Sequence, residues 1–178
     1  MDVHKVCLVG GPYIGKTRLC FALANQYHSP IYDPTIGVEI VAHRVDDTTK
    51  LLYWDTAGHS DFSPIVDKYV NNIKTVLFCY SMNDKGSFLE MVQRYRRYKE
   101  EGMLNDTEVM VCMTQIDKRP FDDAEQKGLH FSSSNHLRFF KTSAVTGAGI
   151  DSLVRGLLRR DVVQDPPTPT QGYFCWPF

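Results

Sequence analysis

The sequence of 178 residues has no excess of charge of either sign, since 20 lysines and arginines stand against 21 aspartates and glutamates. A nucleic-acid-binding protein usually carries a marked basic excess, and anionic membrane surfaces favour basic segments. We therefore expect neither nucleic acid nor an anionic lipid surface among the partners. No apolar run approaches the roughly 18 residues that a membrane-spanning helix needs, and we expect no secretory signal peptide at the N-terminus.

Cysteine occurs five times, without any Cys-x-x-Cys pair of the kind that binds metals or performs redox chemistry. The number is odd, the spacing is wide, and three of the five lie in apolar runs such as residues 6–9 and 77–80. We predict free, buried thiols in a reducing compartment. Metal-ligand spacing is also lacking among five of the six histidines: His4, His28, His43, His130 and His136.

Short apolar runs alternate along the chain with longer segments of helical periodicity, without an internal repeat or a linker in the first 160 residues. This alternation predicts an α/β fold in which helices cover both faces of a mainly parallel sheet. The turn-forming residues 46–49 predict a hairpin between two of the strands. We predict strands at residues 3–9, 38–45, 50–54, 75–81, 108–113 and 137–140, and helices at residues 16–27, 62–73, 87–102 and 149–160.

Three segments have compositions that modify the expected arrangement of helices and strands. The helix at residues 62–73 is expected to be weak, because Pro64 breaks it early. The helix at residues 87–102 carries a basic run from Arg94 to Lys99, which we interpret as a solvated helix face. Residues 161–178 are rich in proline, so we expect a flexible C-terminal tail after a single domain of residues 1–160.

Residues 10–17, which read GGPYIGKT, match the pattern G-x-x-x-x-G-K-[ST] between a predicted strand and a predicted helix. The glycines let backbone N–H groups turn inward toward phosphate oxygens, and the start of the helix adds the positive end of its dipole. Lys16 supplies a positive charge to the outer phosphates, and the Thr17 hydroxyl can ligate Mg²⁺. The motif therefore predicts a nucleotide-binding site.

Four further segments resemble the small GTPases of the Ras superfamily. Residues 32–39 (YDPTIGVE) resemble the first switch, residues 54–58 (WDTAG) the start of the second switch, residues 114–117 (TQID) the guanine-reading segment and residues 142–144 (TSA) the loop behind it. The resemblance implies the small-GTPase fold, a six-stranded, mostly parallel sheet with one antiparallel edge strand. The switch segments are most similar to Rab proteins, whereas the guanine-reading segment is closer to Rho proteins.

The resemblance also implies roles for individual residues. Thr17, Thr35 and Asp55 would hold Mg²⁺, and hydrolysis would depend on Lys16, Thr35 and His59. The bound nucleotide would be contacted by Gly10, Tyr13, Ile14, Gly15, Lys16, Thr17, Arg18, His28, Tyr32, Thr35, Gly58, Thr114, Gln115, Asp117, Ser143, Ala144 and Val145.

A carboxylate at position 117 favours guanine over adenine. Asp117 can accept two hydrogen bonds, which match the N1–H and the exocyclic N–H of guanine, whereas adenine lacks this donor pair. The backbone N–H of Ala144 would then donate to guanine O6. The expected ligands are therefore GTP or GDP with Mg²⁺, and an adenine-nucleotide kinase is a remote alternative.

Several positions near the nucleotide depart from the family pattern. Positions 12 and 13 are usually small, yet Pro12 has no N–H and Tyr13 carries a ring. That ring would either shield the nucleotide or crowd an arginine supplied by a regulator. The aromatic residue that stacks on guanine falls near His28, after Tyr27, and a weaker stack would raise the nucleotide off-rate. Val145 stands where a lysine is usual.

The largest departure is His59, which stands where the family has the glutamine that orients the attacking water. Either His59 has no catalytic part, or its imidazole positions the water less readily than an amide does. Our first hypothesis is a GTP/GDP switch with slow intrinsic hydrolysis, whose effectors bind residues near 32–45 and 55–70. The alternative is a GTP-bound scaffold that does not hydrolyse its nucleotide.

The resemblance implies a monomer whose partners are effector proteins, an exchange factor and a GTPase-activating protein. Residues 175–178 (CWPF) fit a prenylation box only superficially, because the middle residues are not aliphatic and no polybasic run precedes them. We therefore expect a cytoplasmic protein whose membrane association is weak or absent unless Cys175 is lipidated, in which case it would be peripheral at membranes.

Overall fold

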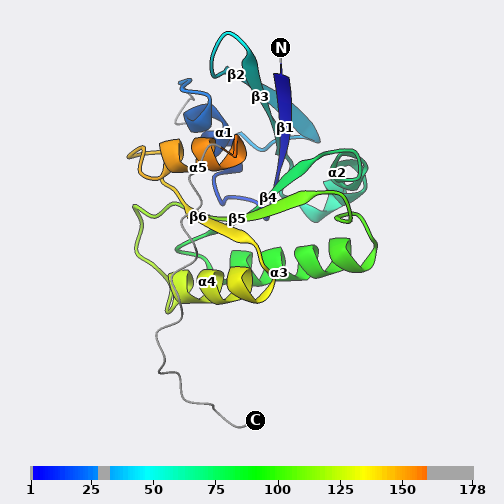
Figure 1. The fold of residues 1–178 in the computed structure, drawn as a ribbon. Coiled ribbons are helices and arrows are strands. Elements are labelled where there is room, and N and C mark those ends of the chain that lie inside the picture. Colours follow the sequence, from blue (N-terminus) through cyan, green and yellow to red (C-terminus); the bar gives the residue numbers. More distant parts are fainter. Residues whose placement is uncertain (1, 28–32, 160–178) are drawn as a thin grey trace.

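The fold is built on a six-stranded sheet, and the computed structural model describes it for residues 2–27 and 33–159 (Figure 1). The strand order is β2-β3-β1-β4-β5-β6, in which β2 runs antiparallel to β3 and every other neighbouring pair is parallel. Within the described residues the strands are β1 (Asp2–Val9), β2 (Val38–Arg44), β3 (Thr49–Thr56), β4 (Thr75–Ser81), β5 (Glu108–Thr114) and β6 (Arg138–Lys141).

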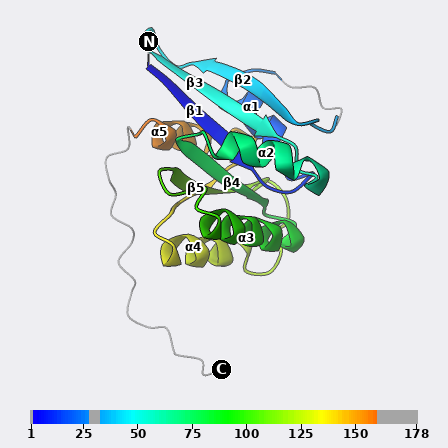
Figure 2. The same ribbon diagram turned by 90° about the vertical axis from the view of Figure 1, so that its right-hand side faces the viewer.

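Helices cover both faces of this sheet (Figures 1 and 2). The first and last helices, α1 and α5, share one apolar core with the sheet, whereas α2, α3 and α4 share the other. Since both faces are covered, the central strand β4 is buried along its whole length. The bounds are α1 (Lys16–Leu23), the short 3₁₀ helix η1 (Ser60–Phe62), α2 (Ser63–Val70), α3 (Lys85–Glu100), α4 (Ala124–Ser134) and α5 (Ile150–Leu157).

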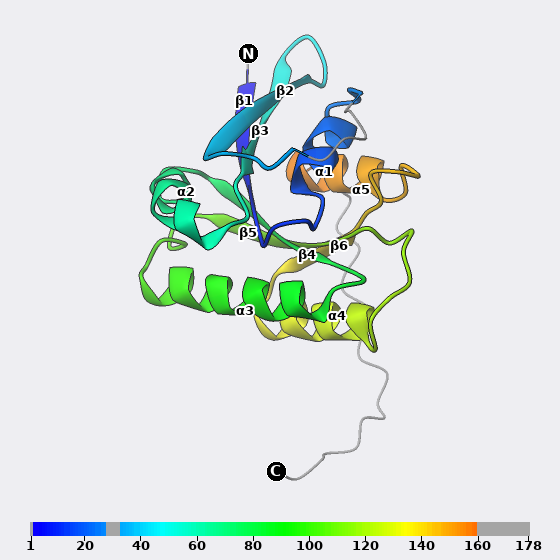
Figure 3. The ribbon, with the colours of Figure 1, turned by 180° about the vertical axis from the view of Figure 1, so that it is seen from behind.

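The carboxyl ends of the parallel strands β1, β3, β4 and β5 meet at one edge of the sheet. Ligands of open α/β sheets bind at this edge, in the loops that follow the strands. Figure 3 shows the loop after β1, in dark blue, running beside α3 before it enters α1. The phosphate-binding motif and the segments after β3 and β5 are therefore brought together by the topology.

The predicted α/β class, with its mainly parallel sheet and one antiparallel edge strand, is confirmed. Some local predictions about the helices are wrong. The first helix ends at Leu23 rather than at residue 27. Pro64 does not break the helix that contains it, because it lies in the first turn of α2, where its missing N–H costs no intrahelical hydrogen bond.

Helix α4 is an element that the sequence analysis did not predict. It buries Ala124, Gly128 and Ser132, which recur every four residues but are too small or too polar to produce an apolar pattern. A Cβ atom at Gly128 would collide with the hydroxyl of Tyr80 and the ring of Phe139. Glycine at this position therefore lets α4 lie close against the sheet.

The basic run of α3 is not a uniformly solvated face, which corrects the interpretation made from the sequence. Arg96 is exposed as expected. The side chain of Arg94, in contrast, is only 9% exposed and pairs with Glu90. Arg97 forms a bidentate ion pair with Asp67 of α2. Two members of the run thus make packing contacts inside the fold.

The prediction of free, buried thiols is confirmed for four cysteines: Cys7, Cys20, Cys79 and Cys112. Burial raises the pKa of Cys7 to about 12 and that of Cys20 and Cys79 well above the usual range, so these thiols stay protonated. Cys175 and the predicted tail of residues 161–178 lie outside the described residues. Across residues 2–27 and 33–159, no helix has both the length and the apolar character needed to cross a membrane.

Candidate nucleotide-binding site

The loop of residues 10–17 connects β1 to α1 and requires glycine at both ends of its motif. Gly15 has φ of +84°, a left-handed conformation that glycine adopts without strain, and α1 begins at the next residue. A Cβ atom at Gly10 would collide with the carbonyl oxygen of Cys79 in β4. The loop is therefore held between β4 and the start of α1.

The side chain of Lys16 is folded back into this loop. Its Nζ donates to the carbonyl oxygens of Gly10 at 3.0 Å and Gly11 at 2.7 Å, and the residue is 6% exposed. Burial lowers the pKa of Lys16, although the nearby carboxylate of Asp55 opposes this shift. A buried ammonium held by neutral carbonyl groups can exchange them for the charged oxygens of a phosphate.

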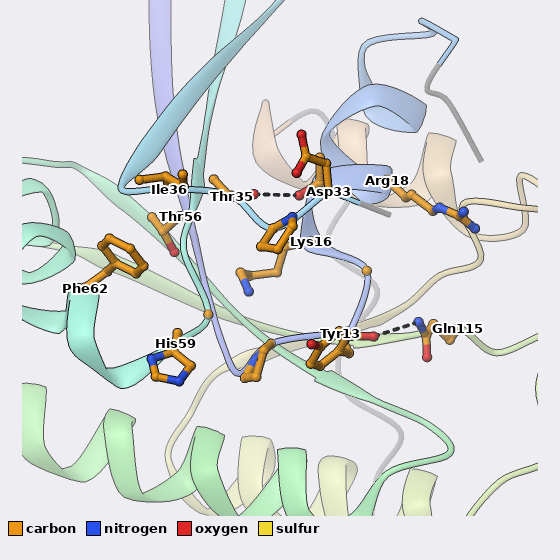
Figure 4. Close-up of a pocket in the computed structure, with 15 residues that line it drawn as sticks. Tyr13, Lys16, Arg18, Asp33, Thr35, Ile36, Thr56, His59, Phe62 and Gln115 are labelled. Carbon is orange, nitrogen blue, oxygen red and sulfur yellow. Dashed lines mark hydrogen bonds between the residues drawn. The ribbon is translucent and has the colours of Figure 1, made fainter. Parts of the chain in front are cut away.

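A cavity of about 390 Å³ opens beside Lys16, between the phosphate loop and residues 33–36 and 56–62 (Figure 4). Tyr13 lines this cavity with φ of +61° and is 73% exposed. Gln115 Nε2 donates to the backbone carbonyl of Tyr13 at 3.2 Å, which ties the phosphate loop to the segment after β5. The Tyr13 ring therefore stands at the mouth of the cavity rather than in the core.

Three oxygen-bearing side chains from three segments converge next to Lys16. Thr17 Oγ1 donates to Asp55 Oδ2 at 2.6 Å, and Thr35 Oγ1 donates to the same oxygen at 3.0 Å. The two hydroxyl oxygens lie 3.1 Å apart. Burial raises the pKa of Asp55, while the Thr17 hydroxyl, Lys16 and the Thr35 hydroxyl oppose that shift.

These three side-chain oxygen ligands fit a hard divalent cation. Mg²⁺ prefers oxygen ligands, and it is commonly bound through one or two carboxylates together with phosphates and water. The other carboxylate oxygen, Asp55 Oδ1, is buried and has no hydrogen-bond partner among the residues that the structure describes. Such an oxygen is expected to be satisfied by a metal-bound water.

A second cavity, of about 50 Å³, adjoins the first and is lined by Asp117, Ala144 and Val145, among others. Asp117 accepts a hydrogen bond from Ser143 Oγ at 2.5 Å. The same hydroxyl oxygen accepts from the backbone N–H groups of Val145 at 3.2 Å and Thr146 at 3.1 Å. Ser143 therefore fixes the Asp117 carboxylate relative to the loop after β6.

The residues of this second cavity are tied to the phosphate loop. Thr114 Oγ1 donates to the backbone carbonyl of Ile14 at 2.6 Å, and Gln115 Nε2 donates to that of Tyr13 at 3.2 Å. Arg18 and Gln115 line both cavities. Figure 4 shows Arg18 projecting from α1 away from Lys16. The two cavities are therefore neighbours along the loop.

His59 lines the larger cavity at the side opposite Arg18 (Figure 4). Its side chain is 63% exposed, and its Nδ1 lies 3.4 Å from the backbone N of Asp61 and 3.3 Å from Asp61 Oδ2. His59 thereby caps the start of η1. The imidazole stands beside the cavity with one nitrogen engaged by its own loop.

Most of the predicted site residues line one of the two cavities or hydrogen-bond to residues that do. His28 and Tyr32 lie outside the described residues. Five other residues of the larger cavity are not among the site residues predicted from the sequence. All five fall within the predicted switch segments, which is the signal that points to them: Asp33, Pro34, Ile36, Thr56 and Phe62.

Comparison with known proteins agrees with this geometry. The family model described as "Ras family" matches residues 5–162. The chain is 25% identical to the Ras-related protein Rab-18 of Lymnaea stagnalis over 165 residues, covering 91% of this chain and 81% of that protein. It is 26% identical to Rab-13 of Canis lupus familiaris (88% and 79% covered) and 25% identical to R-Ras of Rattus norvegicus (94% and 80% covered).

The parallel sheet, the phosphate loop and the oxygen-lined pocket at its end define a nucleotide-binding protein of the phosphate-loop class. The chain belongs to the Ras family of small GTPases and is Rab-like within it. Proteins of this family bind GTP and GDP, typically with Mg²⁺, and hydrolyse GTP.

Proposed function

We propose that this chain is a guanine-nucleotide switch that binds GTP and GDP with Mg²⁺ and hydrolyses GTP slowly. The observation that carries the proposal is the convergence of Thr17, Thr35 and Asp55 beside Lys16. Thr35 belongs to the segment that leads into β2, so the occupancy of this site acts directly on the conformation of that segment. Coupling of a loop to a metal and the γ-phosphate is how such switches work.

The phosphates are proposed to bind at Lys16, with the backbone N–H groups from Tyr13 to Thr17 turned toward them. Thr17, Thr35 and Asp55 would hold Mg²⁺. When bound, the ion neutralises negative charge on the outer phosphates. Pro12 has no N–H, so the phosphate-binding amides begin at Tyr13.

The base is proposed to bind in the smaller cavity, where Asp117 would accept from N1–H and the exocyclic N–H of guanine. The hydrogen bond from Ser143 supports this role, because it orients the carboxylate toward a fixed position. Ala144, Val145 and Arg18 would contact the base or the ribose, and so, on the basis of the sequence, would His28 and Tyr32.

Hydrolysis is proposed to involve His59. Phosphoryl transfer needs a positioned water and stabilisation of charge more than covalent help from the protein. A neutral imidazole with its proton on Nδ1, directed to Asp61 Oδ2, can accept a hydrogen bond from the water through Nε2. It does not simultaneously donate and accept as readily as a glutamine amide. Lys16 and Thr35 would stabilise the γ-phosphate. The expected intrinsic rate is therefore below that of a relative with glutamine at this position.

Single-turnover hydrolysis of Mg²⁺–GTP by the full chain tests this role. We expect His59→Gln to raise the rate and His59→Ala to lower it by about tenfold, which corresponds to roughly 1.4 kcal/mol of positioning. His130→Ala, at an exposed position on α4, is the matched control and should leave the rate unchanged. Equal rates for the wild type and His59→Ala would remove His59 from the mechanism, and the absence of measurable hydrolysis in both would favour the alternative, a GTP-bound scaffold that does not hydrolyse.

The same proposal assigns the partners and the organisation of the chain. Residues 1–160 would form the nucleotide-binding domain of a cytoplasmic monomer, followed by the tail at residues 161–178. Ile36 and Ile40 are 78% and 56% exposed, which supports effector binding along residues 32–45 together with residues 55–70. An exchange factor and a GTPase-activating protein would act on this site, and membrane association would require lipidation of Cys175.

A further inference from the structure

Arg94 of α3 is a buried charge that the proposed chemistry does not use. Its side chain is 9% exposed, and its Nη2 donates to Glu90 Oε1 one turn earlier at 2.7 Å. Arg96, two residues along the same helix, is exposed. A guanidinium is removed from water only at a cost, so its position depends on the acceptors around it.

Those acceptors belong to two segments of the nucleotide site. Arg94 Nη1 donates to the carbonyl oxygen of Gly10 at 3.4 Å, and Nη2 lies 3.5 Å from the carbonyl oxygen of Gly58. Both distances are long for a hydrogen bond. The attraction between Arg94 and the two loops therefore comes mainly from its full positive charge acting on two carbonyl dipoles in a medium of low dielectric constant. One side chain of α3 thus joins the phosphate loop to the loop that carries His59.

The backbones of these two loops are in direct contact beside Arg94. A Cβ atom at Gly58 would collide with the backbone of Gly11 and Pro12, and a Cβ atom at Gly11 would collide with the Glu90 carboxylate. Pro12 has no N–H with which to hold the adjoining loop. Arg94 reaches the carbonyl oxygen of Gly58 from α3.

We propose that Arg94, oriented by Glu90, is a positioning residue that holds Gly58 against the phosphate loop and thereby sets the place of His59 beside the larger cavity. Arg94 does not itself line the larger cavity and contacts no group that reacts, so it acts through the backbone of Gly58, which does line it. An effect of Arg94 on GTP hydrolysis depends on the proposed role of His59, whereas the contact that Arg94 makes between the two loops does not.

Hydrogen exchange of the backbone amides of residues 57–62, in the full chain loaded with GDP, measures this contact. We expect exchange about tenfold faster in Arg94→Met, because the positive charge that attracts the Gly58 carbonyl group is lost. Methionine keeps most of the apolar stem. Arg96→Met is the matched control. Arg94→Lys keeps the positive charge but lacks the two-armed guanidinium, so its amides should exchange more slowly than those of Arg94→Met and faster than those of the wild type. If Arg94→Met folds poorly because the Glu90 carboxylate is left unpaired, the double variant Glu90→Gln/Arg94→Met replaces it in the same exchange measurement.

A double-mutant cycle tests whether Arg94 acts through His59. Arg94→Met should slow single-turnover GTP hydrolysis several-fold in the wild-type background and have no further effect in the His59→Ala background. Equal exchange rates in Arg94→Met and Arg96→Met would overturn the proposed contact. An equal slowing in both His59 backgrounds would overturn its link to His59. Equal hydrolysis by the wild type and His59→Ala would instead refute the proposed function of His59. The hydrogen-exchange rates would still decide whether Arg94 holds Gly58 against the phosphate loop.

Discussion

Replacing Lys16 by methionine should separate nucleotide binding from folding, because the ammonium is costly to the free protein and essential to the complex. Its two hydrogen bonds, at 3.0 and 2.7 Å, go to the neutral carbonyl groups of Gly10 and Gly11, and burial lowers its pKa. A hydrogen bond to a charged group contributes about 1.5–3 kcal/mol. If the same ammonium holds two phosphate oxygens, its loss costs about 3–6 kcal/mol of binding, or roughly 10²- to 10⁴-fold in Kd.

The free energy of unfolding measured without nucleotide should change far less, by about 1 kcal/mol or less, because methionine fills a similar volume and removes a buried charge. Calorimetric titration with GDP and Mg²⁺ gives the affinity, and urea unfolding of the nucleotide-free protein gives the stability. Lys85→Met, at an exposed position on α3, is the control. A Kd for Lys16→Met within threefold of the wild type would refute the assignment of the phosphate site.

Two other substitutions test the metal site and the base site. Thr17→Asn should weaken GTP more than GDP in the presence of Mg²⁺, because the Thr17 hydroxyl lies 2.6 Å from Asp55 in the proposed metal site. An unchanged ratio of the two affinities, with and without Mg²⁺, would contradict this. Asp117→Asn should lower GTP affinity roughly 10²-fold and raise XTP affinity, since the new amide can donate to the C2 carbonyl of xanthine. Wild-type affinity for GTP, without any gain for XTP, would remove Asp117 from base recognition.

The parts of the site that could be predicted from the sequence are those set by local spacing. The phosphate motif fixes a strand, a loop and a helix in order, so the positions of Gly15, Lys16 and Thr17 follow from a run of eight residues. Asp117 and Ser143 are far apart in the sequence, but each lies within four residues of the end of a predicted strand of the same parallel sheet. The sheet topology then brings them to one edge, where they form a hydrogen bond.

The parts that could not be predicted depend on long-range packing. Helix α4 buries small residues such as Gly128, whose closeness to β4 leaves no apolar periodicity in the sequence. Arg94 belongs to a run of basic residues that looks solvated, and its contacts to Gly10 and Gly58 span 84 and 36 residues. Its spacing, three residues after Met91 and four before Tyr98, places it beside the apolar face of α3, but only the tertiary fold decides that the phosphate loop meets the helix there.

The nucleotide that copurifies with the full chain tests the central claim most directly. After rapid purification in buffer with Mg²⁺, the protein is denatured, and the released nucleotide is identified and quantified by ion-exchange chromatography against standards. A switch that binds guanine nucleotides tightly and hydrolyses GTP slowly should carry mainly GDP, close to one molecule per chain. An adenine nucleotide would contradict the assignment of the base site, and GTP without GDP would contradict hydrolysis.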